Sequence, residues 1–228
     1  MGDSKEYKKL YRLRKKIIKV NKYIKYCLLL VLVALLAYKS VYFEKLSARK
    51  NNAAVSFDAV GFSKKLWEEK MPEKLDSAID LSQLITAIDK EGETSINKYT
   101  NALAIGNYRY ALVKLNAIVT DVKEDEVMLS MKHGDSLLTV NLATEFIYGN
   151  AIRDASGLVQ VKDFPNTTDL NSISEELNKI IRTSILPTFK TSVKKGDNLN
   201  VVAAVELNKE HIHWSNMELL PVRIQVVN

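Results

Sequence analysis

The segment of this 228-residue chain with the richest polar chemistry reads Gly-Asn-Ala-Ile-Arg-Asp-Ala over residues 149–155. Its Gly-Asn pair permits unusual backbone angles and can bring main-chain N–H groups forward. Arg153 carries a planar fork of donors that suits a carboxylate, a phosphate or a sugar hydroxyl. Asp154 can accept a hydroxyl proton or hold Arg153 in position. We therefore take Gly149, Asn150, Arg153 and Asp154 as candidate ligand-binding residues.

The same four residues also have a structural interpretation. Arg153 and Asp154 can form an ion pair that closes the loop after a group of strands, and the spacing alone favours this pair over a ligand site. Both interpretations stay open at the level of the sequence.

Known catalytic motifs are missing from the sequence. It contains no nucleophile elbow, P-loop, dinucleotide fingerprint, HExxH zinc motif or EF-hand loop. We therefore expect a protein that is not an enzyme. The enzymatic alternative is a saccharide hydrolase or lyase that uses Asp154 or Asp163 with Glu145, and it requires two carboxylates about 5 to 10 Å apart across a cleft.

Metal and cofactor sites are not expected either. Cys27 is the sole cysteine of the sequence, so neither a disulfide nor a CxxC metal site can form within the chain. His211 and His213 would point to one face of a strand, where they could hold a metal. No acidic or cysteine partner follows nearby, so a solvated strand face is the favoured interpretation. Trp67 and Trp214 could stack on sugar rings, although both occupy positions typical of core residues.

The net charge of +6 is concentrated at the start of the chain. Residues 1–25 hold ten Lys and Arg against two acidic residues, a net charge of +8, so the remaining residues carry −2. A nucleic-acid-binding domain needs basic residues clustered on a folded face. We therefore expect no nucleic-acid partner.

An apolar run follows the basic segment. Residues 26–38 are too few to cross a bilayer as a helix, but the aromatic-flanked stretch 23–43 is long enough. Basic residues on its N-terminal side predict that the N-terminus stays inside. No A-x-A cleavage pattern or lipobox is present, which favours a retained signal anchor over a cleaved signal peptide. Either alternative exports the remaining domain.

These features predict four segments: a basic cytoplasmic tail over 1–22, a transmembrane signal anchor over 23–43, a tether over 44–56 and an extracytoplasmic α+β domain over 57–228. The predicted location is the bacterial cytoplasmic (inner) membrane, crossed once, with the domain in the periplasm or extracytoplasmic space.

The domain is predicted to begin with helices. Apolar residues before Pro72 indicate a short helix that stops there. A second helix begins after Asp80, which stands at a capping position, and ends at Gly92.

Two groups of alternating apolar residues follow and predict strands. The first group has strands around 115–119, 127–131 and 138–142, and the second has strands around 201–207, 212–214 and 222–226. A helix that starts at Ser172 and is ended or kinked by Pro187 lies between the groups. Strands interrupted by one helix predict an OB-like curled antiparallel sheet or small barrel with an inserted helix.

The motif at 149–155 resembles a bacterial family described as predicted periplasmic lipoproteins (domain of unknown function 2291). Asp163-Phe164 with Asn166, Leu177-Asn178, Trp67 with Met71-Pro72, Gly106-Asn107-Tyr108 and Leu220-Pro221-Val222 also match its layout. The resemblance spans about residues 57 to 227 and adds Asn166 to the candidate ligand-binding residues. The chain departs from the family in lacking its lipoprotein cysteine, and in having Asn166-Thr167 where many members have Asn-Gln.

The resemblance implies a role beside sugar ABC transporters, because family members are often encoded with transporter components. We therefore expect a membrane-anchored extracytoplasmic binding or interaction module, accessory to a carbohydrate transporter. Its expected partners are the membrane, through residues 23–43, and a transporter or solute-binding protein. A purely structural partner of a membrane complex is a third alternative, which would show an exposed apolar patch and no pocket.

Overall fold

The computed structural model describes residues 24–36, 38, 57–103 and 106–227. The chain divides into two compact units, Met1–Ser56 and Phe57–Asn228. Among the described residues, the buried hydrophobic core is supplied entirely by the second unit. Because this unit has a complete core of its own, it has what independent folding requires.

The described part of the first unit is helical over residues 24–36 and at residue 38, with exposed side chains. Across the described ranges, no helix has the length and apolar character needed to cross a membrane. The predicted span over 23–43 includes residue 23, residue 37 and residues 39–43, which lie outside the described residues. The predicted basic tail and tether also lie outside them.

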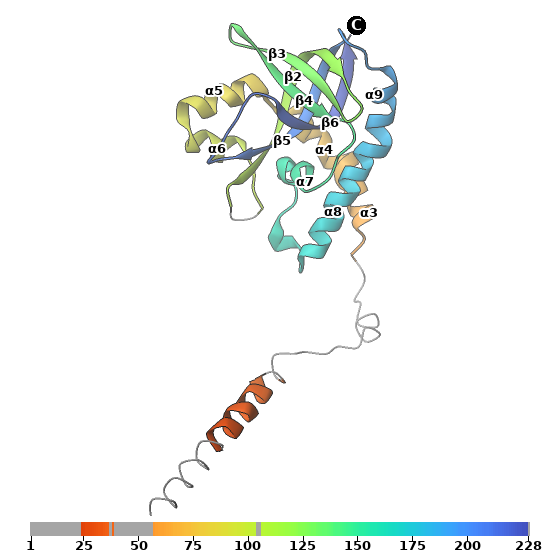
Figure 1. Cartoon of the computed structure of the whole chain (residues 1–228). Helices are drawn as coiled ribbons and strands as arrows, with labels where there is room; N and C mark the ends of the chain where they lie inside the picture. The colour runs from red at the N-terminus through yellow and green to blue at the C-terminus, as the bar shows by residue number, and fades with distance from the viewer. Residues whose placement is uncertain (1–23, 37, 39–56, 104–105, 228) are drawn as a thin grey trace, which may run out of the picture. The chain divides into compact units, whose positions relative to one another are not determined.

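The second unit is built around a closed barrel (Figure 1). Its strands are β2 (Tyr108–Val122), β3 (Glu126–His133), β4 (Ser136–Ala143), β5 (Asn198–Asn208) and β6 (Met217–Val227). They are hydrogen-bonded in the order β2-β3-β4-β6-β5, and a further pairing between β5 and β2 closes the ring. This is the connectivity of a five-stranded Greek-key barrel, as expected for an OB-like fold.

The sheet is mixed rather than antiparallel, which corrects the prediction. β4 and β6 run parallel where Val140–Leu142 lie beside Met217–Leu219, and a two-residue strand β1 (Ile79–Asp80) runs parallel to β2. Apolar alternation shows that a strand has one buried face, but it does not reveal the direction of the neighbouring strand.

The predicted strand at 212–214 is also wrong. Ile212 and Trp214 lie in the loop between β5 and β6, where the Trp214 indole Nε1 donates to Asp89 Oδ1 at 2.9 Å. Two apolar residues in alternation are too short a signal to distinguish a strand from a loop that packs against the core.

The remaining strand predictions are confirmed by the barrel interior. Val113, Leu115 and Ala117 of β2 are buried and lie opposite Ala203, Val201 and Leu199 of β5. Buried residues of β3 and β4 complete the same core, which is the period of two expected for strands with one inward face.

The helical lead-in packs outside the barrel. It consists of α3 (Ala59–Lys65), a π-helical turn η1 (Leu66–Lys70), α4 (Met71–Asp76), α5 (Leu81–Glu91) and α6 (Glu93–Tyr99). α5 is confirmed: the Asp80 carboxylate accepts from Gln83 N at 3.1 Å, and Gly92 follows its last residue. Pro72 does not end the first helix as predicted, because the chain continues through η1 into α4.

A second helical segment joins β4 to β5. It comprises α7 (Ala151–Ser156), a 3-10 turn η2 (Val161–Asp163), α8 (Thr167–Ile180), a π-helical turn η3 (Ile181–Ile185) and α9 (Leu186–Ser192). α8 begins five residues before the predicted start at Ser172, because Asn166 caps it by accepting from Asp169 N at 2.9 Å. α8 and α9 follow one another along one side of the barrel (Figure 1).

Candidate functional site

The motif at 149–155 forms a turn followed by a buried helix. Gly149 has φ of +78°, a backbone angle that favours glycine, and Asn150 directly precedes α7. All six residues of α7 are buried. The helix lies against β2, β5, β6 and α8. Its Arg and Asp are therefore inside the protein.

Arg153 and Asp154 form an internal ion pair. Arg153 Nε donates to Asp154 Oδ1 at 2.7 Å, and Arg153 Nη1 donates to the carbonyl of Leu170 at 2.9 Å. Both side chains are nearly excluded from solvent, with 7% and 2% of their surface exposed. The pair links α7 to α8. The geometry of these two residues therefore fits the interpretation as a structural ion pair.

Asn150 and Tyr110 extend this pair into a buried polar cluster, which we define as Tyr110, Asn150, Arg153 and Asp154. Asn150 Nδ2 donates to the second carboxylate oxygen of Asp154. Burial raises the pKa of the Tyr110 hydroxyl to about 12, although its hydrogen bond with Asn150 acts in the opposite direction. Glu206, opposite Tyr110 on β5, adds to the rise. Tyr110 is therefore a neutral phenol at ordinary pH.

Gly149 connects the turn to α8 on its other side. Its carbonyl accepts from Asn178 Nδ2 at 2.8 Å. The Asn178 Oδ1 atom is buried and has no hydrogen-bond partner among the described residues. Arg182 reaches the same turn: it donates to the carbonyl of Ile147 and lies over the Tyr148 ring, 5.0 Å from its centroid.

The structure does not bring Asn166 into this cluster. Asn166 caps α8 with its Oδ1 atom and also donates from Nδ2 to Asp169 Oδ2 at 3.0 Å. Its side chain is exposed and serves the helix terminus.

Two cavities touch Gly149 and Asn150. One, of about 520 Å³, is also lined by Arg153 and Arg182. The other, of about 400 Å³, is lined by three exposed aromatic side chains. We call it the aromatic–polar cavity. The residues that define it are Tyr108, Phe146, Tyr148, Asn150, Glu206 and Glu218. Tyr108 exposes 52% of its surface, and Phe146 and Tyr148 expose 63% each. The exposed rings can pack on the apolar face of a ligand. The neighbouring carboxylates and amide can hydrogen-bond to hydroxyl groups at the edge of that ligand.

Sequence reasoning missed most of this cavity. Tyr108 belongs to the start of β2, Phe146 and Tyr148 to the segment after β4, and Glu206 to β5. One signal was available: Phe146 and Tyr148 alternate with buried Ile147 immediately before the Gly-Asn turn. Such alternation places two aromatic side chains on the solvent side of an extended segment.

His211 and His213 line the aromatic–polar cavity from the loop between β5 and β6. They are not on a strand, so the predicted shared strand face does not exist. Within the described residues, no group of three or more His, Cys, Asp or Glu side chains is placed to hold a metal ion.

The two tryptophans lie elsewhere. Trp214 is bonded to Asp89, and Trp67 lines a separate apolar cavity. The three carboxylates of the enzymatic alternative are also differently placed: Asp154 is buried against Arg153, Glu145 pairs with Lys190 at 2.8 Å, and Asp163 is exposed in η2. The burial of Asp154 argues against the version of that alternative that uses Asp154, whereas Asp163 stays exposed.

A closed Greek-key barrel with helices inserted between its third and fourth strands is an OB-type fold, and solved structures agree. The crystal structure of an OB-fold protein from Thermotoga maritima MSB8 matches with a TM-score of 0.66 at 21% sequence identity. The match covers 75% of this chain and 99% of the Thermotoga chain. At this identity, the likeness establishes the fold.

The family model described as predicted periplasmic lipoprotein (domain of unknown function 2291) matches residues 31–225. The chain belongs to this family, which confirms the resemblance and agrees with an extracytoplasmic domain. No curated protein matches the chain.

Proposed function

We propose that the protein is a membrane-anchored extracytoplasmic module that binds neutral saccharides and serves a carbohydrate ABC transporter. The observation that supports the binding role is the aromatic–polar cavity. Three exposed aromatic rings surround it, and they provide the apolar faces on which sugar rings pack. A cavity of about 400 Å³ is also within the usual size range of small-molecule sites.

The charges that line the cavity select among ligands. Glu206 and Glu218 line it, whereas no Lys or Arg of the described residues does. Carboxylates accept hydrogen bonds from sugar hydroxyls and repel anions. Neutral sugars therefore fit this cavity better than sugar phosphates.

The Gly149–Asn150 turn gives the cavity a fixed wall. Asn150 is held from behind by Asp154 and Tyr110, and Gly149 by Asn178. A wall fixed in this way loses little conformational freedom when a ligand binds. In this proposal, Gly149 and Asn150 contact the ligand, while Arg153 and Asp154 hold the turn in place.

The anchor is the segment over 23–43, preceded by the basic residues of 1–22. The positive charge keeps the N-terminus inside and places the domain outside the cytoplasm. The transporter or its solute-binding protein is the proposed partner, because the proposed ligands of the cavity are sugars, which such transport systems import.

Isothermal titration of residues 57–228 with glucose, galactose, xylose, arabinose and maltotriose tests the binding role. We expect saturable binding of at least one sugar and at least a tenfold loss in Tyr148→Ala. Leu137→Ala is the control, because Leu137 is 78% exposed on β4 and does not line the cavity. Unchanged affinity in Tyr148→Ala would place the sugar elsewhere.

A further inference from the structure

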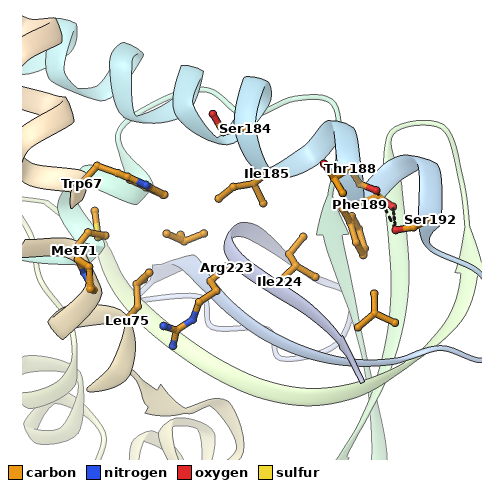
Figure 2. A pocket seen from close by; sticks show the side chains of 13 residues that line it. Trp67, Met71, Leu75, Ser184, Ile185, Thr188, Phe189, Ser192, Arg223 and Ile224 are labelled. Carbon is orange, nitrogen blue, oxygen red and sulfur yellow. Dashed lines mark hydrogen bonds between the residues drawn. The ribbon is translucent and has the colours of Figure 1, made fainter. Parts of the chain in front are cut away.

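A second cavity, of about 610 Å³, lies between the helical lead-in, the η3–α9 segment and β6. We call it the apolar cavity. Its apolar lining includes Trp67, Leu75, Ile185, Phe189, Ile224 and Val226, and it shares no lining residue with the aromatic–polar cavity. Figure 2 shows Trp67, Ile185 and Ile224 around one space, with Arg223 along its lower side. Its size suits a small-molecule ligand.

Two walls of the apolar cavity are built from π-helical turns. Met71 N donates to Leu66 O at the end of η1, and Leu186 N donates to Ile181 O at the end of η3. Each turn is followed by a proline, Pro72 or Pro187, whose missing N–H and bulky ring disturb a regular helix. The prolines explain why each turn is wide. They do not explain why both wide turns border the same cavity. π-Helical turns are frequent at functional sites.

The third wall is irregular as well. In the β5–β6 pairing, Val202 lies opposite Arg223 and Ala203 lies opposite Pro221, so Val222 has no partner on β5. A bulge of this kind bends a strand and redirects side chains. Val222, Arg223 and Ile224 all line the apolar cavity, although a regular strand would turn Arg223 to the opposite face.

Arg223 is the one charged residue among the described residues that line the apolar cavity. Its Nη1 atom donates to Asp76 Oδ1 at 2.8 Å, with 39% of the Arg223 and 71% of the Asp76 side chain exposed. An ion pair this exposed is weak. Arg223 retains Nε and Nη2 donors for which the described residues supply no hydrogen-bond partner, and guanidinium donors bind carboxylates well.

We propose that the apolar cavity binds a single-chain aliphatic carboxylate. The alkyl chain packs against Trp67, Ile185 and Ile224, and the carboxylate is bound by the free donors of Arg223. Burial of an alkyl chain against these walls supplies the driving force, and the cation selects the head group. This site is independent of the saccharide-binding role, because it uses different residues on different elements.

Fluorescence of Trp67 tests the proposal directly. The chain has two tryptophans, so Trp214→Phe in residues 57–228 leaves Trp67 as the only one. We expect saturable quenching by 10-bromodecanoate below its micellar concentration, displaced by decanoate. Decyltrimethylammonium should not displace it, since the charged residue that lines the cavity is the cation Arg223.

Two further variants locate the ligand. Arg223→Gln should weaken decanoate binding about tenfold, the effect of one lost charged contact. Thr188→Phe places a ring into the cavity from its exposed rim and should abolish saturable quenching while cooperative unfolding is retained. Equal affinity for the cationic amphiphile, no saturable quenching in the parent, or unchanged binding in Thr188→Phe would each overturn the proposal. Saccharide titration of Thr188→Phe should match the parent, which separates this site from the aromatic–polar cavity.

Discussion

At the scale of single residues, the polar side chains of the 149–155 motif divide into two groups. Arg153 and Asp154 face inward and connect α7 to α8, whereas Gly149 and Asn150 form a wall of the aromatic–polar cavity. Asn150 belongs to both groups, because its side-chain amide donates a hydrogen bond to Asp154 and Asn150 also lines the cavity. The motif therefore supports the turn more than it contacts a ligand.

Arg153→Met should destabilise the domain strongly. Removing one member of a buried ion pair leaves the other unpaired, at a cost of about 3–5 kcal/mol. Lys190→Met is the matched control, since its pair with Glu145 is exposed and should contribute only about 0–1 kcal/mol. Urea unfolding of residues 57–228 measures both. Equal stability losses in the two variants would contradict the internal role of Arg153.

Tyr110 should make stability fall at high pH. Its pKa is raised to about 12 in the folded protein, against an ordinary value of 10.0. The neutral phenol is therefore favoured by folding, so its contribution is complete below pH 10 and is lost as pH rises from 10 towards 12. Unfolding at pH 9 and pH 11.5 should show a larger loss in the parent than in Tyr110→Phe. An identical loss would show that another group titrates.

At the scale of elements, short sequence patterns correctly predicted the helices and strands that depend on residues close together in the sequence. The strands around 115–119, 127–131 and 138–142 and the Asp80-capped helix follow from alternation and capping, which are read within a few residues. The parallel contact of β4 with β6 depends on residues about 77 positions apart, and no short pattern encodes it.

Other elements were predicted wrongly because a second signal prevailed. Asn166 and Ser172 both resemble helix caps, and the earlier cap is the one used. Pro72 was predicted to stop the first helix, yet a π-helical turn before it lets the chain continue. The aromatic–polar cavity could not be assembled from sequence, because β2, β5 and the segment after β4 meet only in the closed barrel.

Gly149→Ala tests the turn before α7. An added methyl group would meet no atom of the described residues within 4 Å, so the cost arises from the φ of +78°. We expect a loss of roughly 1–2 kcal/mol in thermal or urea unfolding. Gly106→Ala is the control. A methyl group added there also meets no atom of the described residues within 4 Å, and the φ of Gly106 is not positive, so stability should stay or rise by up to about 1 kcal/mol. A larger loss at Gly106 would refute this account of the turn.

At the scale of the whole molecule, the main prediction is the membrane topology. It rests on the N-terminal segment, most of which lies outside the described residues. Alkaline phosphatase joined after Asn228 should be active in a bacterial host, because the proposed anchor exports the domain. Changing the ten basic residues of 1–25 to Gln should lower that activity by weakening the orientation signal. A reporter that is active only when joined before residue 23 would reverse the proposed topology.

The central claim is that the barrel carries a saccharide site walled by the Gly149–Asn150 turn. Amide chemical-shift mapping of ¹⁵N-labelled residues 57–228 tests it most directly, with each sugar and with glucose 6-phosphate as the anionic comparison. We expect saturable shifts at Tyr148, Gly149, Asn150 and Glu206 for a neutral sugar and none for the phosphate. No shift with any sugar, or shifts confined to residues around Trp67 and Arg223, would contradict it.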